Sequence, residues 1–253
     1  MAKNMNKIKS AFAALLFVPL LALAAGDHLK LDRAPVSDDQ TSLQRGARHF
    51  VNYCLNCHSA GYMRYNRLRD IGLTDQQILD NLVFTGVKVG DLMKVGMDAK
   101  DAKGWFGVSP PDLSVIARSR ASADGSGADW LYTYLRGFYR DAERPSGWNN
   151  TVFPNVGMPH ALWALQGEQV LEEHKVRGDG YLKTEMKLKL DKPGKLTPLE
   201  YDRMVADLVN YLVFMAEPVH AERKTIGMFV LLALGLLFVL AYALKKEYWK
   251  DVH

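Results

Sequence analysis

The stretch Cys54-Leu55-Asn56-Cys57-His58 contains both cysteines of this 253-residue chain. Two cysteines separated by two residues and followed at once by a histidine form the attachment site of a c-type haem. The two thiols can form thioether bonds with the porphyrin vinyl groups, and the histidine then reaches the iron as its proximal ligand. The motif therefore predicts one covalently bound haem c, held by Cys54, Cys57 and His58.

Two other kinds of site use closely spaced cysteines. A structural zinc site needs four ligands, and a second Cys or His pair at a suitable spacing is missing from the sequence. A thioredoxin-like redox pair belongs at a strand-to-helix turn in a βαβ unit, whereas this motif follows a helical pattern. Both alternatives fit the sequence less well than a haem attachment site.

The first 25 residues have the composition of a secretory signal peptide. Three lysines precede the apolar run 11–24, which ends in the small-residue pattern Ala22-Leu23-Ala24. An uncleaved anchor fits less well because the apolar run is short. The sequence predicts cleavage near Ala24 or Ala25 and export across a bacterial inner membrane, on whose outer side c-type haem is attached.

A second apolar segment, 225–244, is long enough to cross a membrane. Its twenty residues carry no charge, and a helix of that length spans about 30 Å, the thickness of a hydrocarbon core. Lys245, Lys246 and Lys250 after it favour a cytoplasmic C-terminus, whereas Arg223-Lys224 before it favours the opposite. Export of the N-terminal part decides for the first orientation.

These features divide the chain into four parts. We predict a signal peptide at 1–25, an exported haem domain at 26–222, a transmembrane anchor at 225–244 and a cytoplasmic tail at 245–253. The protein is then a single-pass protein of the bacterial inner membrane with its haem domain in the periplasm.

The net charge of +4 at pH 7 comes from the two ends of the chain. Residues 25–224 contain 26 basic and 26 acidic side chains, so the exported part is neutral. A nucleic-acid-binding domain carries a marked basic excess. The sequence therefore excludes nucleic acid as a partner of the exported domain.

Helix-start signals occur both before and after the haem motif in the exported domain. The capping box Thr41-Ser42-Leu43-Gln44 predicts a helix that ends at the haem motif. Thr74 begins a shorter helix, and 129–138 is aromatic-rich and helical. Thr197-Pro198-Leu199-Glu200 begins a helix that should cross the N-terminal one and lead, through a linker at 216–225, to the apolar segment.

The charged segment 161–196 predicts a partner-facing insertion. Met186, Leu188 and Leu190 alternate with lysines, which is the pattern of a half-buried strand, and Gly178-Asp179-Gly180 precedes them as a turn. A small β-hairpin is expected there.

Met158 is the candidate for the second axial ligand. It lies in Val156-Gly157-Met158-Pro159, and the flanking Gly and Pro suit a tight loop that brings a thioether close to the iron. Methionine ligation raises the potential and favours electron transfer. Met158 can equally fill a gap in the core. On the residues alone, several rivals stay open: Met93, Met97, His49, His160 and His174.

Four stretches occur in a characteristic order along the chain: Tyr53 to Ser59 with Tyr62, Met63 and Tyr65; Ser109-Pro110-Pro111-Asp112-Leu113-Ser114; Phe153-Pro154 leading to Gly157-Met158-Pro159; and Ala216-Glu217-Pro218 with His220, Arg223 and Lys224. Together they resemble the cytochrome c1 family, the haem subunits of cytochrome bc1 complexes. The resemblance covers nearly all of the chain after the signal peptide. It implies a mainly α, class I cytochrome c-like haem domain with insertions, a small β-hairpin among them, and one C-terminal transmembrane helix.

The resemblance also assigns residues to the haem pocket. It implies that Met158 is the sixth ligand and that Arg120 pairs with a haem propionate, a carboxylate that a guanidinium binds bidentately. Arg118 is the near alternative, and both arginines can instead be surface residues. The sequence departs from the family at Trp130, where an aromatic hydroxyl is common, and at 104–107, where an Asn-rich run is expected.

As a function, the resemblance implies electron relay without bond chemistry in this subunit. Cytochrome b and the Rieske iron–sulfur protein are the implied partners in a dimeric, membrane-bound complex. The implied electron acceptor is a soluble or tethered cytochrome c, and the complex couples quinol oxidation to proton translocation. Two alternatives remain: a free-standing membrane-anchored cytochrome c that donates to an oxidase, and a haem enzyme or sensor with an open sixth position.

Overall fold

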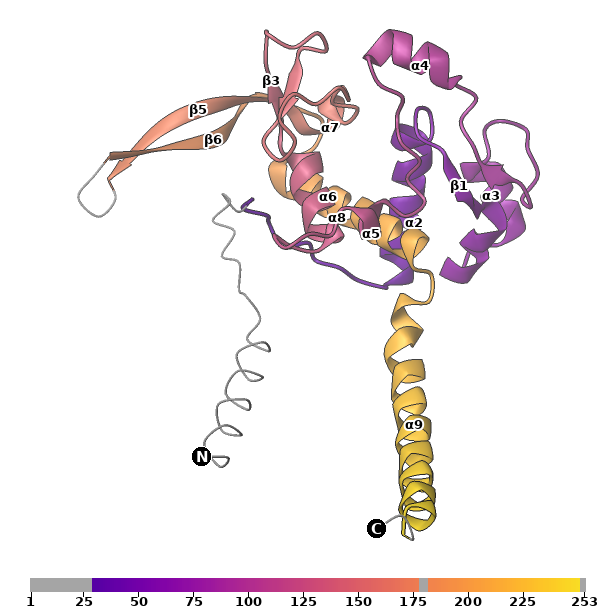
Figure 1. Ribbon diagram of the computed structural model, residues 1–253. Helices are drawn as coiled ribbons and strands as arrows, with labels where there is room; N and C mark the ends of the chain where they lie inside the picture. The colour runs from indigo at the N-terminus through magenta and orange to yellow at the C-terminus, as the bar shows by residue number, and fades with distance from the viewer. Residues whose placement is uncertain (1–28, 178–181, 251–253) are drawn as a thin grey trace, which may run out of the picture.

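The computed structural model describes residues 29–177 and 182–250, which fold into helices and three small two-stranded sheets. The mainly α architecture predicted from the sequence is confirmed (Figure 1). The first half of the chain contains α2 (Gln40–His49), the π-helical turn η1 (Phe50–Cys54), β1 (Ala60–Arg64), η2 (Tyr65–Ile71), α3 (Asp75–Leu82), β2 (Leu92–Met93), α4 (Ala99–Phe106) and α5 (Ile116–Ser119). The second half contains α6 (Gly127–Arg136), β3 (Phe138–Arg140), β4 (Trp148–Asn150), α7 (Trp163–Gln166), β5 (Gly167–Arg177), β6 (Leu182–Pro193), α8 (Pro198–Ala216) and α9 (His220–Tyr248).

The core of the domain is the crossing of α2 and α8, as the sequence predicts. Ala47 and Phe50 on one side and Leu208 and Tyr211 on the other are buried at this crossing. Gly46 makes the close approach possible, because a Cβ atom there would collide with the carbonyl oxygen of Asp207. The helix that carries the haem motif is thereby fixed to the C-terminal half of the chain.

Two of the predicted helix starts are confirmed, and two lie elsewhere. Thr197 and Thr74 each close a capping box at the start of α8 and α3. In α2, however, Asp39 is the cap: its carboxylate accepts a hydrogen bond from Ser42 N at 2.8 Å, so the helix begins before Thr41. The aromatic-rich helix α6 also begins two residues earlier than predicted, because Ser126 caps it.

The hairpin of β5 and β6 is longer than predicted and projects from the domain (Figure 1). Glu168 joins its base to β3, since this carboxylate pairs with Arg140 at 2.7 Å and with Lys192 at 2.9 Å. The predicted half-buried strand is confirmed only at Leu188, which is half-buried. Met186 and Leu190 are exposed, because the strand passes over an open groove instead of packing on the core. The predicted turn 178–180 lies outside the described residues.

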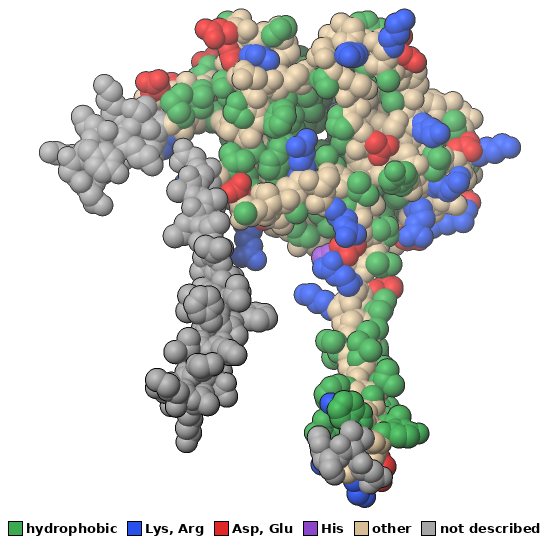
Figure 2. Space-filling model, viewed as in Figure 1, with side chains coloured by type: hydrophobic (Ala, Val, Ile, Leu, Met, Phe, Trp, Pro, Cys, Tyr) green, Lys and Arg blue, Asp and Glu red, His purple; other side chains and the backbone are tan. Residues whose placement is uncertain are grey.

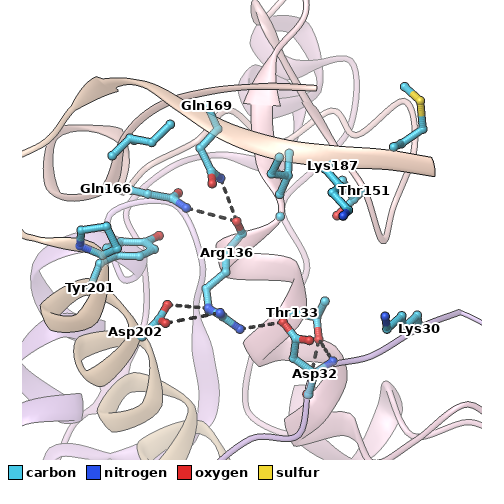
Figure 3. A pocket seen from close by; sticks show the side chains of 15 residues that line it. Lys30, Asp32, Thr133, Arg136, Thr151, Gln166, Gln169, Lys187, Tyr201 and Asp202 are labelled. Atoms are coloured by element: carbon cyan, nitrogen blue, oxygen red, sulfur yellow. Dashed lines mark hydrogen bonds and ion pairs between the residues drawn. The ribbon is translucent and has the colours of Figure 1, made fainter. Parts of the chain in front are cut away.

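The groove beneath the hairpin has a volume of about 650 Å³ and a polar floor (Figure 3). Arg136 of α6 lies on that floor and bridges Asp202 of α8, at 2.6 Å, and Asp32 of the N-terminal segment, at 2.8 Å. Gln166 and Gln169 both donate hydrogen bonds to the carbonyl oxygen of Arg136. This network connects the N-terminal segment at Asp32, α6, α8 and the base of the hairpin.

The apolar segment near the C-terminus forms part of α9, which extends away from the domain (Figure 1). Residues 222–248 are long and apolar enough to cross a membrane, and none of the span is buried against the domain. The linker is shorter than the predicted 216–225, because α8 ends at Ala216 and α9 begins at His220. The turn between them is closed by a hydrogen bond from His220 N to Glu217 O. The predicted signal peptide lies outside the described residues.

Candidate functional site

A cavity of about 380 Å³ lies beside the Cys-x-x-Cys-His turn, within the range of about 300–1,000 Å³ that is usual for small-molecule and cofactor sites. Its lining comes from the haem-motif turn, from the run 106–113, from α5, α6 and α8, and from the loop 153–161. Hydrophobic side chains gather in the hollow at the centre of the view in Figure 2. Its lining contains all five residues that the sequence assigns to the haem: Cys54, Cys57, His58, Arg120 and Met158.

The two cysteines lie on one tight turn at the end of η1. Cys57 N and His58 N both donate hydrogen bonds to the carbonyl oxygen of Cys54, at 3.0 and 2.8 Å. Burial, with a contribution from Cys57, raises the pKa of the Cys54 thiol to about 12. Both thiols are free and border the same cavity, as a double thioether attachment requires.

The imidazole of His58 is oriented by a backbone carbonyl. Its Nδ1 lies 2.7 Å from the oxygen of Pro111, which can only accept, so Nδ1 carries the proton. Burial lowers the pKa of His58 and keeps the ring neutral, although the hydrogen bond to Pro111 opposes that shift. The lone pair of Nε2 is left free for a metal, which is the usual arrangement of a metal-ligating histidine.

The segment that presents the Pro111 carbonyl is itself pinned to the strand after the haem motif. Asp112 accepts hydrogen bonds from Gly61 N at 2.6 Å and from Ser114 N at 2.8 Å. Burial raises the pKa of Asp112, but these hydrogen bonds outweigh it and hold the pKa below its ordinary value. Ser114 in turn accepts from Tyr62 N. The run 109–114 is therefore a brace for the histidine.

Met158 reaches the cavity from the loop between β4 and α7. A Cβ atom at Gly157 would lie 2.9 Å from the side chain of Val108, so only glycine lets the loop come this close. The hydroxyl of Tyr134 donates a hydrogen bond to Met158 Sδ over 3.3 Å. The thioether is thus held in the wall of the cavity.

The rival ligands do not line this cavity. Met93 is fully buried in β2, and Tyr211 donates a hydrogen bond to its sulfur. His160 is buried between the rings of Phe138 and Trp148, at 4.7 and 5.0 Å between centroids. His174 lies on the projecting hairpin. Met97 and His49 are also absent from the lining.

Of the two candidate arginines, only Arg120 borders the cavity. Its guanidinium carbon lies 4.5 Å from the ring centroid of Trp130 and 5.6 Å from that of Phe153. Arg118 is exposed and outside the lining. The lining contains no aspartate or glutamate, so Arg120 is a cation in a largely apolar cavity.

The residues of this cavity fit a c-type haem by the chemistry of their donors. Two thiols lie on one turn, a neutral imidazole has one free lone pair, and a thioether comes from a different element. The remaining lining is mostly apolar and aromatic, with one guanidinium that can meet a carboxylate. Among the described residues no group of three or more His, Cys, Asp and Glu side chains could hold a metal ion elsewhere.

Comparison with known proteins places this site in a family. The sequence profile of the Cytochrome C1 family matches residues 32–103 and 88–252. The chain belongs to the cytochrome c1 family. Proteins of this family contain covalently bound haem c in a membrane-anchored subunit, so the Cys-x-x-Cys-His turn and the apolar helix α9 both have a place in it.

Individual relatives are similar over most of the chain. Cytochrome c1 of Allochromatium vinosum is 49% identical over 250 residues, which cover 97% of this chain and 98% of that protein. A protein of Nitrosomonas europaea named ammonia monooxygenase gamma subunit is 52% identical over 250 residues, which cover 98% and 100%. Cytochrome c1 of Rhodospirillum rubrum is 26% identical over 242 residues, which cover 85% and 83%.

Sequence reasoning missed two contributors to the site. Pro111 contributes its backbone carbonyl oxygen, which every residue has, so its role cannot be predicted from its side chain. Tyr134 does have a signal: it follows Trp130 by four residues and therefore lies on the same face of α6. What the sequence does not show is that Met158, twenty-four residues later, meets this face.

Proposed function

We propose that this chain is a c-type haem electron carrier, the cytochrome c1 subunit that passes electrons from a Rieske iron–sulfur protein to a cytochrome c within a bc1 complex. The observation that carries the proposal is the single cavity that joins the Cys-x-x-Cys-His turn to the thioether of Met158. Membership of the cytochrome c1 family supports the same role.

Within this proposal, each residue of the cavity has one task. Cys54 and Cys57 would hold one haem c covalently, and His58 and Met158, which line the same cavity, would hold its iron. When bound, the haem supplies a reversible one-electron iron couple. If both side chains held the iron, no site would be left for a substrate, and the subunit would not be catalytic by itself. Arg120 neutralises a haem carboxylate.

The membrane arrangement follows from the two apolar ends. We propose that the signal peptide 1–25 directs residues 26–222 to the periplasm of a bacterium, that 225–244 crosses the inner membrane and that 245–253 is cytoplasmic. The turn of Glu217–Val219 between α8 and α9 supports this arrangement, because it leaves the haem domain close to the bilayer.

The partners proposed are cytochrome b, the Rieske protein and a soluble or tethered cytochrome c, in a dimeric complex. The name of the Nitrosomonas relative points to a different assembly, a monooxygenase. Gentle solubilisation of membranes that contain an affinity-tagged chain, followed by mass spectrometry of co-purifying proteins, separates these two. Cytochrome b and a Rieske protein are expected, and monooxygenase subunits in their place would contradict the proposal.

The ligand assignment is tested by Met158→Leu. The oxidised parent should show the weak near-infrared band of methionine bound to ferric haem, with one haem per chain by mass. The variant should lose that band and have a lower midpoint potential, because a thioether favours the reduced iron. An unchanged band would reject Met158, and a parent without the band would favour an enzyme or sensor with an open sixth position.

A further inference from the structure

Arg120 borders the cavity without an anionic partner from the protein. Across residues 29–177 and 182–250, no carboxylate or carbonyl oxygen accepts a hydrogen bond from its guanidinium, and the cavity lining contributes no acid. Arg120 is half-buried, and its guanidinium has five N–H donors in one plane. A carboxylate inside the cavity could accept hydrogen bonds from them without competing with an acid of the lining.

Two aromatic rings hold this guanidinium in place of an acid. Its carbon lies over the ring of Trp130 at 4.5 Å and over that of Phe153 at 5.6 Å. A cation over an indole face is attracted by the ring electrons, and tryptophan is the strongest of the aromatic residues in this respect. The attraction uses no N–H···O hydrogen bond, so N–H groups of the guanidinium stay free to bind an anion.

Trp130 is itself rigidly held. Its side chain is only 8% exposed and stacks on Tyr134, with ring centroids 4.7 Å apart and planes 14° from parallel. Tyr134 is anchored by its hydrogen bond to Met158 Sδ. The rings of Phe153 and Trp130 lie edge to face, with their centroids 6.5 Å apart. The indole is thus a fixed platform, one ring removed from the proposed axial ligand.

We propose that Trp130 is a positioning residue that aims the N–H edge of Arg120 at a haem carboxylate. The inference rests on the proposed function, because the carboxylate is that of the haem. Trp130 carries no charge, so it cannot neutralise a carboxylate by itself, whereas the guanidinium that lies over its ring can. The residue acts on the carboxylate through Arg120.

The consequence for the haem is electrostatic. A guanidinium fixed beside a carboxylate keeps it ionised and cancels its charge. Less negative charge near the iron favours the reduced state, so the fixed arginine raises the midpoint potential. A mobile arginine that swings into water leaves the carboxylate less shielded. The potential then falls, and it begins to depend on pH because the carboxylate takes up a proton more easily.

The experiment is a double-mutant cycle measured by redox titration of the purified, membrane-bound haem protein between pH 5 and pH 9. The variants are Trp130→Leu, Arg120→Gln and the combination of the two. Each single variant should have a lower midpoint potential and a steeper pH dependence than the parent. In the Arg120→Gln background, Trp130→Leu should cause no further fall. Trp130→Phe, which retains a ring under the guanidinium, should restore most of the potential.

The result that would overturn the proposal is an equal fall caused by Trp130→Leu with and without Arg120, since the ring would then act independently of the arginine. If Trp130→Leu yields no haem protein, Phe153→Leu takes its place in the cycle. Phe153 is 45% exposed, so its replacement leaves the core intact, and its smaller effect must likewise vanish in the Arg120→Gln background. A Phe153→Leu shift that persists there overturns the proposal as well.

Failure of the proposed function has a different signature. A parent protein without haem, or without the near-infrared methionine band, would refute the electron-carrier assignment before the cycle begins. If the haem and the band are present and the two substitutions are additive, only the role of Trp130 is refuted.

Discussion

At the scale of single residues, the hydroxyl of Tyr134 makes the contact that bears most directly on the proposed electron carrier. It donates a hydrogen bond to Met158 Sδ over 3.3 Å, and burial raises its pKa, so the hydroxyl stays protonated. A donor on a ligand sulfur draws electron density away from the metal. Oxidised iron loses more by this than reduced iron, so the hydrogen bond should raise the midpoint potential.

We therefore predict that Tyr134→Phe lowers the midpoint potential by about 20–60 mV. The range follows from a hydrogen bond worth about 0.5–1.5 kcal/mol and from 59 mV per tenfold change in a one-electron equilibrium. Redox titration of the purified protein measures the shift, and the near-infrared band should persist because the thioether itself is unchanged.

Tyr132→Phe is the matched control for Tyr134→Phe. Tyr132 lies on the same helix and is also buried, but it packs against Arg136 and does not line the cavity. Its hydroxyl should have no influence on the potential. Equal shifts in the two variants would show that α6 responds to any loss of a hydroxyl and would contradict the specific role of Tyr134.

Sequence alone can assign the site residues that lie close together along the chain. Cys54, Cys57 and His58 lie within five residues on one turn, so their spacing identifies them. Met158 needed the neighbouring Gly157 and Pro159 and the family resemblance to stand out from its rivals. Partners that meet only in three dimensions, such as the Pro111 carbonyl and His58, have no pattern along the chain.

At the scale of secondary-structure elements, the crossing of α2 and α8 positions the haem motif, and Gly46 is its tightest point. We predict that Gly46→Ala destabilises the domain by about 1–3 kcal/mol, because the new methyl group overpacks against the backbone of α8 at Asp207. Alanine is the better helix former by about 1 kcal/mol, so any net loss reports the collision. Denaturant unfolding followed by circular dichroism measures the difference.

Gly104→Ala is the control for the crossing. Gly104 is also a helical glycine, in α4, but a Cβ atom there would meet nothing within 4 Å. This variant should be neutral or slightly stabilising through helix propensity alone. If Gly46→Ala were as stable as Gly104→Ala, the close packing of α2 on α8 would be refuted.

The hairpin base gives a prediction on pH. Hydrogen bonds from Arg140 and Lys192 lower the pKa of Glu168 to about 2, from an ordinary value of 4.5. Because the folded state binds the proton less readily, this clamp stabilises the hairpin above pH 4.5 and is lost as the pH falls from 4.5 towards 2. The protection of the amides of β5 and β6, measured against their intrinsic exchange rates, should therefore decrease over that range, and it should decrease more than in Glu168→Gln.

In Glu168→Gln the carboxylate is absent, so the additional loss of amide protection at low pH should vanish. Glu173→Gln is the matched control, since Glu173 is exposed on the same strand and makes no ion pair within the described part of the chain. Equal pH dependence in the parent and in Glu168→Gln would contradict the clamp.

The start of a helix or strand can be predicted from the sequence where one local signal is present and no alternative signal lies nearby. Thr197-Pro198-Leu199-Glu200 contains three helix-start signals that agree, and α8 begins there. Near α2, Asp39 and Thr41 offer equally good local caps, and packing against α8 chooses the earlier one. The alternation in β6 correctly indicates a strand, but its apolar side lies over a groove, and periodicity cannot tell a groove from a core.

At the scale of the whole molecule, the haem domain is closed by its own contacts and not by the membrane helix. Arg136 joins the N-terminal segment at Asp32 to α8 at Asp202, and α8 crosses α2 beside the haem motif. Both ends of the domain are therefore fixed before α9 begins. The apolar span could be predicted from its length and its lack of charge. The ion pairs that close the domain could not, because they join residues that are far apart in the sequence.

Separation of the domain from its anchor tests this organisation. We predict that a chain ending at Pro218, with its own leader retained, is recovered without detergent and carries haem with the spectrum and thermal stability of the full chain. None of the span 222–248 is buried, so its removal uncovers no core. Two contacts are lost, that of Arg223 with Glu217 and that of His220 Nδ1 with Asp38 at 3.5 Å, but both lie at the surface and contribute little. Cell fractionation, haem staining of gels and thermal melts of the two forms are the measurements. A truncated chain that aggregates or lacks haem would show that α9 contributes to the fold of the domain as well as to its attachment.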